Sequence, residues 1–498
     1  MSACVLAIDQ GTTNTKVLLI DRLGRVAARG SAAVPVRYPR PGWAEQSGSE
    51  IWQSVVAAAE ECLSAASGAT VAAIGISNQR ESVMLWRRDS GEPIGPCISW
   101  QCRRSADGLA GLSSDAAEFV QARTGLGLDP LFPAAKIGWL LDAYPEARSL
   151  AAAGDLCAGT VDSWLVFRLT GGHVHATDVG NASRTQLFNI HDCRWDDELC
   201  AMFGVPLAIL PMVRASDADF GLTVGDGPLP ARVAVRAVMG DSHAALFGHG
   251  IRKPGAAKAT YGTGSSLMAL TDGPVASRSG LSTTIAWQRG DSPQYALEGN
   301  IIVSAQAAMW VAGVLGLSDA DALTALAETV SHSDGVYFVP ALAGLGAPRW
   351  KARARAAFVG MSLATQRGHL ARATLEAIAL QVRDVFAAME SDLGRALEVL
   401  SVDGGATRND VLMQMQANVI GRPIRRPPVA ELSALGAGIM AGVASGFADE
   451  AALSQSVVGG QAAAGGTFMP KMSTDERQQI LAGWQAAVAG AIEASVRS

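Results

Sequence analysis

The sequence lacks the marks of several protein classes. It contains no Gly-Lys-Ser or Gly-Lys-Thr, so the P-loop solution to phosphate binding is absent. Its seven cysteines, an odd number, include no Cys-x-x-Cys pair, which favours reduced thiols in a cytoplasmic protein over disulfides or a zinc site. Uncharged runs are short, and no basic segment precedes the first apolar run. We therefore expect neither a membrane span nor a signal peptide.

The chain is also poor in charge, and in basic charge most of all. Only 17% of its residues are charged, and 40 basic against 46 acidic residues give a formal net charge of −6. Nucleic-acid binding needs a basic face, so we expect no nucleic-acid partner. Hydrophobic residues make up 49% of the 498 residues, which is enough to bury the cores of two large domains.

Three Gly-rich turns follow strand-like runs. In residues 6–19, a turn with Asp9 beside it separates two apolar runs, which predicts a hairpin whose N–H groups and hydroxyls face an anion. Residues 257–270 repeat this pattern. In residues 400–409, a strand runs into Gly404-Gly405, where a flat group such as adenosine can approach the backbone. Together the turns predict two related lobes that close on one nucleotide.

Both halves of the chain open with strand patterns and continue with alternating helices, which predicts an α/β fold. The Gly-rich segment 248–255 predicts the connection between the halves, and we expect domains over 1–250 and 251–498. The expected elements are strands near 3–9, 15–21, 25–34 and 71–77, a helix over 49–67, a second strand-rich region over 256–298 and a final helix over 474–496.

These turns and further motifs resemble the FGGY carbohydrate kinases, and within that family most closely the glycerol kinases. The resemblance implies two ribonuclease-H-like domains of the actin/Hsp70/sugar-kinase superfamily, with a cleft between them. It also implies ATP-dependent phosphorylation of a hydroxyl of a small polyol or sugar, with Mg²⁺. The motifs cover almost the whole chain: residues 9–13, 77–81, 132–142, 159–164, 181–185, 240–241, 262–264, 344–348 and 360–376.

The resemblance gives roles to residues on the acceptor side. Asp241 would be the general base that takes the proton of the attacking hydroxyl. Arg80 and Glu81 would grip the acceptor hydroxyls, and Trp100 would pack on the carbon chain. Without the family context, an Asp after a Gly is a turn residue, and an adjacent Arg-Glu pair is two solvated charges.

The resemblance also marks the nucleotide side. Asp9 would hold Mg²⁺, through water. Lys16 stands where the glycerol kinases have an arginine, so it offers a cation but not a bidentate fork. The positions that match nucleotide contacts are Thr12, Thr13, Asn14 and Lys16 in the first hairpin, Thr263 in the second, and Gly405 and Asn409 on the adenosine side.

Three acceptor-side positions depart from the glycerol-kinase pattern. Leu131 replaces a tyrosine, Ser242 replaces a glutamine and Ser266 replaces a phenylalanine. The loss of aromatic bulk and the gain of small hydroxyls predict a larger and more polar pocket. Such a pocket fits glycerol loosely and favours a four- or five-carbon polyol or ketose. A site that lacks matching hydrogen bonds to a substrate discriminates poorly in its favour.

Three alternatives remain open. They are a glycerol kinase proper, a ketopentose kinase similar to xylulokinase or ribulokinase and, from a different class, an actin- or Hsp70-like nucleotide switch. The motifs around Arg80 and Trp100 argue against the switch. His243 and His249 lack the spacing of a metal site, so we interpret them as structural. We expect a small-molecule substrate as the partner, and the sequence allows a homodimer.

Overall fold

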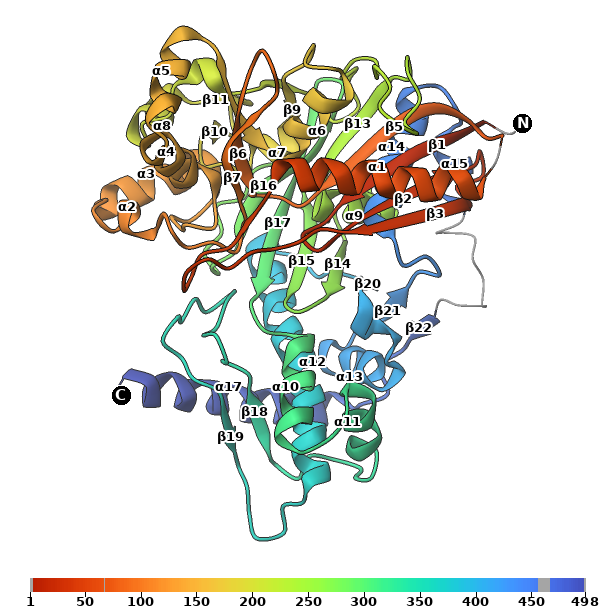
Figure 1. Ribbon diagram of the computed structural model, residues 1–498. Helices are drawn as coiled ribbons and strands as arrows, with labels where there is room; N and C mark the ends of the chain where they lie inside the picture. The colour runs from red at the N-terminus through yellow and green to blue at the C-terminus, as the bar shows by residue number, and fades with distance from the viewer. Residues whose placement is uncertain (1–2, 67, 456–465, 497–498) are drawn as a thin grey trace.

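The first half of the chain builds a five-stranded sheet in the computed structural model, which describes residues 3–66, 68–455 and 466–496. The strand order is β13-β5-β1-β2-β3 (Figure 1). Strands β1, β5 and β13 are parallel, and β2 runs antiparallel to both of its neighbours. The bounds are β1 Ala3–Gln10, β2 Asn14–Ile20, β3 Val26–Ala33, β5 Thr70–Asn78 and β13 Val235–Gly240.

The second half builds a seven-stranded sheet, in the order β16-β17-β15-β14-β20-β21-β22. Apart from β16 and β22, its strands numbered along the chain follow the order 3-2-1-4-5, as in the first sheet. This repeat confirms the predicted α/β class. The bounds are β14 Ala256–Tyr261, β15 Ser265–Thr271, β16 Ser282–Arg289, β17 Ser292–Ile301, β20 Val399–Asp403, β21 Ile424–Arg426 and β22 Gly466–Phe468.

The sequence explains the core of the first sheet. Parallel strands covered on both faces read as continuous apolar runs, and residues 4–8 of β1 are all buried. Helix α1 (Gly48–Ala65) covers one face, starting at Ser47, whose side chain accepts a hydrogen bond from the N–H of Glu50. The expected helix over 49–67 and the expected strands of the first half therefore lie close to their observed bounds.

A helix from the second half of the sequence covers the other face. Helix α14 (Leu432–Ala444) packs on β5, β1, β13 and α9 (Asp241–Gly248), and Figure 1 shows it beside the first sheet. A Cβ atom on Gly436 would lie 1.9 Å from the carbonyl oxygen of Ala244 in α9. Two glycine-free helices cannot approach so closely. The chain therefore returns to the first sheet after β21 and before β22, the last strand of the second sheet.

The remaining elements form two groups. A four-stranded sheet, β4-β7-β6-β8, adjoins the first sheet and packs with α4 and α5, while a long helix, α12, runs through the core below the second sheet (Figure 1). The bounds are β4 Glu45–Gln46, β6 Val83–Arg87, β7 Pro93–Ile98, β8 Leu156–Thr160, α4 Pro133–Ala143, α5 Pro145–Ala153, α7 Val179–Ala182, α10 Ala305–Val314, α11 Ala320–Ala327, α12 Arg367–Leu393, α13 Asp410–Ile420 and α17 Thr474–Val496.

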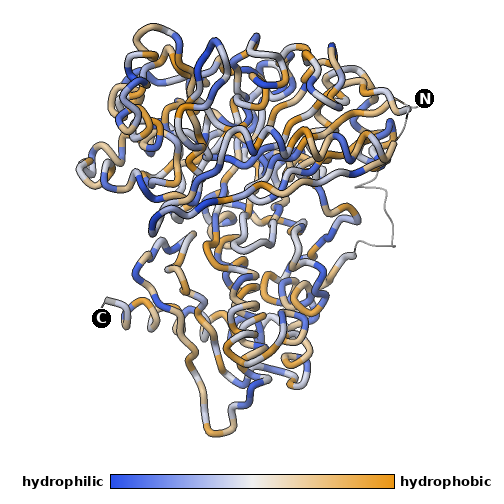
Figure 2. The backbone as a smooth tube through the Cα atoms, viewed as in Figure 1, coloured by the Kyte–Doolittle hydropathy of each residue, from blue (hydrophilic) through white to orange (hydrophobic). Residues whose placement is uncertain are grey.

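Hydrophobic stretches are interrupted by hydrophilic ones throughout the chain (Figure 2). None of the described helices is long and apolar enough to cross a membrane.

We expect Gly436→Ala to lower the free energy of unfolding by about 1–3 kcal/mol, because the new methyl group overlaps backbone atoms of α9 that cannot move aside. Urea unfolding followed by circular dichroism measures the change. The matched control is Gly490→Ala in α17, where no described atom outside the neighbouring backbone of the helix lies within 4 Å of the added Cβ atom. That control is expected to be neutral or slightly stabilising. Equal stability of the Gly436 variant and the wild type would contradict this packing.

Candidate active site

The candidate catalytic residues lie where three parallel strands of the first sheet end. Asp9 lies near the end of β1, Arg80 and Glu81 follow β5, and Asp241 follows β13. Because neighbouring parallel strands present their carboxyl ends at one edge of a sheet, these residues come together although 232 positions separate the first from the last.

Five charged side chains, four of them buried, form one cluster on the acceptor side. Arg80 Nη2 lies 2.5 Å from Glu298 Oε1, and Arg184 Nη2 lies 2.9 Å from Glu298 Oε2. Arg184 Nε donates a hydrogen bond of 2.7 Å to Glu81 Oε1. Arg80 Nε lies 3.3 Å from Asp241 Oδ1. The predicted residues Arg80, Glu81 and Asp241 therefore belong to one cluster with Arg184 and Glu298.

The cluster sets the proton affinity of its carboxylates in opposite directions. Burial alone would raise the pKa of Glu298, but Arg184 and Arg80 hold it well below its usual range. For Asp241, burial raises the pKa, and Arg80 only partly opposes this effect. A carboxylate with a raised pKa takes a proton more readily at neutral pH, which is the property a general base needs.

His243 supports Arg80 from the same helix that begins at Asp241. Its Nε2 atom lies 3.3 Å from Arg80 Nη1, and the ring is fully buried. Burial lowers the pKa of His243 well below its usual value, so the neutral ring accepts the arginine's hydrogen bond. The residue is therefore a buried support of the site.

Leu131 reaches the cluster indirectly, through Lys136, whereas Ser266 contacts it directly. The buried Lys136 in α4 donates hydrogen bonds to the carbonyl oxygens of Glu81 (3.1 Å) and Leu131 (2.5 Å), so it ties the turn after β5 to the loop before α4. Glu81 adopts a φ of 61°, which this anchoring helps to hold. Ser266 in β15 donates from Oγ to Glu298 Oε1 over 3.2 Å.

Trp100 links the acceptor side to the first hairpin. Its indole Nε1 donates a 2.9 Å hydrogen bond to Thr12 Oγ1, and its side chain remains partly exposed. Thr13 and Asn14 are exposed in the same turn. Lys16 lies opposite Asp9 in the pairing of β1 with β2, where its charge partly opposes the rise that burial causes in the pKa of that acid. The hairpin therefore presents hydroxyls and one cation beside a carboxylate.

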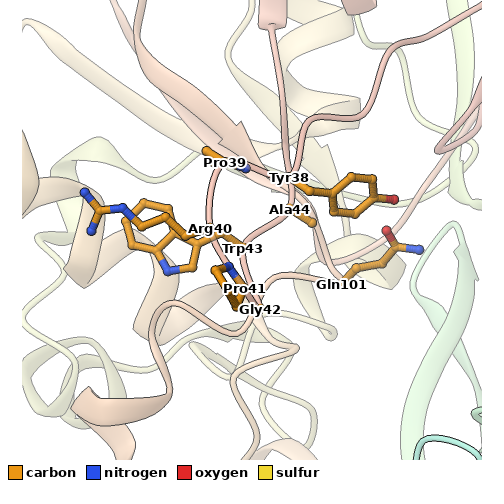
Figure 3. A pocket seen from close by; sticks show the side chains of 8 residues that line it. All are labelled: Tyr38, Pro39, Arg40, Pro41, Gly42, Trp43, Ala44 and Gln101. Carbon is orange, nitrogen blue, oxygen red and sulfur yellow. The ribbon is translucent and has the colours of Figure 1, made fainter.

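A surface hollow of about 480 Å³ borders the chain next to Trp100. Figure 3 shows Tyr38 and Gln101 on one side of it and Arg40 with Trp43 on the other. Neither Arg80 nor Asp241 lines this hollow. We therefore do not assign the acceptor to it.

The second sheet offers the nucleotide side. Strands β14 and β20 are parallel, so the turn containing Thr263 and the Gly404-Gly405 pair follow them at one edge. Gly404 has a φ of 95°, and a Cβ atom there would lie 2.3 Å from the carbonyl oxygen of Tyr261. In front of Gly405, the described residues leave 4 Å of open space. Asn409 caps α13 through the N–H of Leu412 and donates to Thr324.

These residues fit a nucleotide with a magnesium ion. The two hairpin turns offer N–H groups and hydroxyls that suit phosphates, and the backbone at Gly405 leaves room for a flat base. Burial, with the nearby Asp241, raises the pKa of Asp9 to about 6, so a cation beside this acid is favourable. The described residues contain no cluster of three metal-ligating side chains. A carboxylate such as that of Asp9 is a ligand type that suits Mg²⁺, which keeps several waters and uses few protein ligands.

Comparison with known proteins identifies the chain. Residues 4–248 match the N-terminal domain of the FGGY family of carbohydrate kinases, and residues 257–445 match its C-terminal domain. The chain belongs to the FGGY family of carbohydrate kinases. It is therefore an ATP-dependent carbohydrate kinase with the two-domain fold of the actin/Hsp70/sugar-kinase superfamily.

Relatives named as glycerol kinases and as an apulose kinase are similar to this FGGY kinase over most of its length. A glycerol kinase of Burkholderia multivorans is 45% identical over 98% of this chain and 97% of its own. An apulose kinase of Pectobacterium atrosepticum is 48% identical over 89% of this chain and 90% of its own. The solved structure of Plasmodium falciparum glycerol kinase with ADP superimposes with a TM-score of 0.92, at 32% identity and 98% coverage of both chains.

Sequence reasoning missed Glu298 and Arg184 as parts of this site. Arg184 lies in the motif over 181–185 that carried the family resemblance, but the motif alone does not say what the arginine contacts. Glu298 stands between apolar residues in the run Ala296-Leu297-Glu298-Gly299. An acid in an otherwise buried strand needs a charged partner. Its presence in this run was the signal from which a buried ion pair could have been predicted.

We expect Asp241→Asn to raise the melting temperature at neutral pH. Folding raises the pKa of Asp241, so its charged form costs stability above that pKa, and the cost disappears as the pH falls to the value of the unfolded chain. The gain should therefore vanish near pH 4. The control is Asp403→Asn, which we expect to lower the melting temperature at neutral pH. Burial would raise the pKa of Asp403, but His249 holds it below its usual value. Thermal scans at both pH values measure this, and a destabilised Asp241 variant at neutral pH would contradict the assignment.

Proposed function

We propose that this FGGY kinase transfers the γ-phosphoryl group of ATP to a hydroxyl of a four- or five-carbon ketose or polyol, with Asp241 as the general base. The observation that carries the proposal is the cluster of Arg80, Glu81 and Asp241 at one edge of the first sheet. A guanidinium and a carboxylate side by side offer one donor and one acceptor to a polyhydroxy substrate, and a third group stands ready for the proton.

Asp241 is the proton acceptor in this proposal. It opens α9, and its Oδ1 atom accepts a 2.6 Å hydrogen bond from the N–H of Ser242, which fixes the carboxylate plane. Arg80 and Glu81 orient the acceptor so that one hydroxyl faces Asp241, and that hydroxyl's proton passes to the carboxylate as its oxygen attacks.

The hairpins and the glycine pair hold the nucleotide in this proposal. Thr12, Thr13, Asn14, Lys16 and Thr263 hold the phosphates, Gly405 and Asn409 border the adenosine, and Asp9 holds Mg²⁺. When bound, Mg²⁺ neutralises charge on the phosphates. Trp100 donates a hydrogen bond to Thr12 and lies between the acceptor residues and the first hairpin. In this proposal its environment changes when either substrate binds.

Two lines of support favour an acceptor longer than glycerol. Leu131, Ser242 and Ser266 replace larger or aromatic residues of the glycerol-kinase pattern, and Ser266 has a hydroxyl at the buried acid Glu298. The relative named apulose kinase is 48% identical, against 45% for the glycerol kinase of Burkholderia multivorans. Apulose, a five-carbon sugar, lies within the proposed size range.

The second candidate function is glycerol phosphorylation itself. It is favoured by the glycerol kinases, which are similar over nearly the whole chain. A nucleotide switch is disfavoured, because both halves match carbohydrate kinases. A homodimer and a cytoplasmic location stay predictions.

A panel of acceptors tests the proposed substrate class. We expect the best C4 or C5 acceptor among erythritol, erythrulose, ribulose, xylulose and apulose to exceed glycerol in kcat/KM by about tenfold or more, because one or two added hydrogen bonds contribute roughly 1.4 kcal/mol or more. A coupled ADP-release assay with Mg²⁺ and ATP gives the ratios.

The control variant is the pair Leu131→Tyr and Ser266→Phe, which restores the aromatic residues of the glycerol-kinase pattern. It is expected to shift the ratio toward glycerol, because it fills the volume that a longer acceptor would use. If glycerol is the best acceptor of the wild type, the chain is a glycerol kinase and the larger-pocket argument is wrong.

A further inference from the structure

Glu298 brings a negative charge from the second sheet into the acceptor site. It lies in β17, which pairs with β15 and β16, whereas Arg80, Arg184 and Glu81 come from the first half of the chain. The Glu298 side chain is 0% exposed, and each of its two oxygens contacts an arginine. One carboxylate of the second half therefore holds two cations of the first.

The charges around Glu298 cannot be neutralised by proton loss. An arginine stays protonated in a protein, so Arg80 and Arg184 need compensating carboxylates when buried. Glu298 contacts both, and Glu81 contacts Arg184 at 2.7 Å but Arg80 at only 3.9 Å. Without the charge of Glu298, the nearest carboxylate left to Arg80 is Asp241, at 3.3 Å from its Nε atom.

We propose that Glu298 is a positioning residue of the acceptor site: it holds both Nη atoms of Arg80, so that the Nε atom is left to face Asp241, and it fixes Arg184 against Glu81. The inference rests on the proposed function, in which Arg80 and Glu81 bind the acceptor. Through Glu298, the second sheet sets the geometry of a pair that belongs to the first. Loss of the Glu298 charge therefore weakens acceptor binding more than nucleotide binding.

Ser266 connects this network to the position that we associate with acceptor size. Its Oγ donates to the same Oε1 atom of Glu298 that contacts Arg80. A phenylalanine, as in the glycerol-kinase pattern, has no hydroxyl to donate there. In this chain, the residue that enlarges the pocket therefore also bonds to the carboxylate that holds Arg80.

A matched control exists elsewhere in the chain. Glu450 also bridges two arginines, with Oε1 at 2.5 Å from Arg252 Nε and Oε2 at 2.8 Å from Arg289 Nη1. Neither of these arginines forms an ion pair with a residue of the candidate site. Glu450→Gln therefore removes a carboxylate bridge between two arginines, at a half-buried rather than a fully buried position, without touching the acceptor side.

The experiment compares Glu298→Gln, Glu298→Asp and Glu450→Gln with the wild type, using the panel acceptor of highest kcat/KM. For Glu298→Gln, we expect the KM for that acceptor to rise at least tenfold, while the KM for ATP stays within twofold. Glu298→Asp keeps the charge but is one methylene shorter, so we expect a rise of at least threefold and smaller than that of Glu298→Gln. Glu450→Gln is expected to leave both KM values within twofold.

An unchanged acceptor KM in folded Glu298→Gln overturns the proposal, as does an equal rise in both KM values. If circular dichroism shows that Glu298→Gln does not fold, Glu298→Asp decides: a selective rise in acceptor KM supports the proposal, and none overturns it. The two proposals fail in different ways. A wild type that phosphorylates no acceptor of the panel contradicts the proposed function, whereas an active wild type with unchanged Glu298 variants contradicts only the role of Glu298.

Discussion

Strand direction is the constraint on which this site depends. In each sheet, parallel strands end at one edge, so the residues that follow them meet in space from distant parts of the sequence. Asp9, Arg80 and Asp241 meet at the edge of the first sheet, and the turns with Thr263 and Gly405 meet at the edge of the second. Antiparallel neighbours would send these groups to opposite edges. Helix α14 crosses α9 closely and covers one face of the first sheet.

Electrostatics refines what the strands bring together. Buried ion pairs give little net stability, because desolvation offsets their attraction, but they are costly to break on one side only. The pairs of Glu298 with Arg80 and Arg184 therefore fix side-chain positions more than they add to folding free energy. Asp241 is left with a raised pKa, a stability cost that suits a proton acceptor.

Much of this account was accessible from the sequence because local patterns encode local structure. Apolar runs broken by Gly-Thr turns predicted the first hairpin, and the helix expected over 49–67 lies close to the observed α1. Long-range contacts were not accessible. No local signal says that Leu432–Ala444 returns to the first sheet, or that Glu298 lies against Arg184, because such pairs are set by the packing of whole sheets.

Phosphorus NMR of ATP turnover by the wild type and Asp241→Asn, each with and without the best acceptor, tests the central claim most directly. The account predicts a phosphomonoester signal only with acceptor present, and a rate lower by about 10²–10⁴-fold in Asp241→Asn, with ATP binding retained by calorimetry. A near-normal rate in Asp241→Asn would contradict the role of Asp241. Release of inorganic phosphate by the wild type at one rate with and without acceptor would contradict phosphoryl transfer to a sugar or polyol.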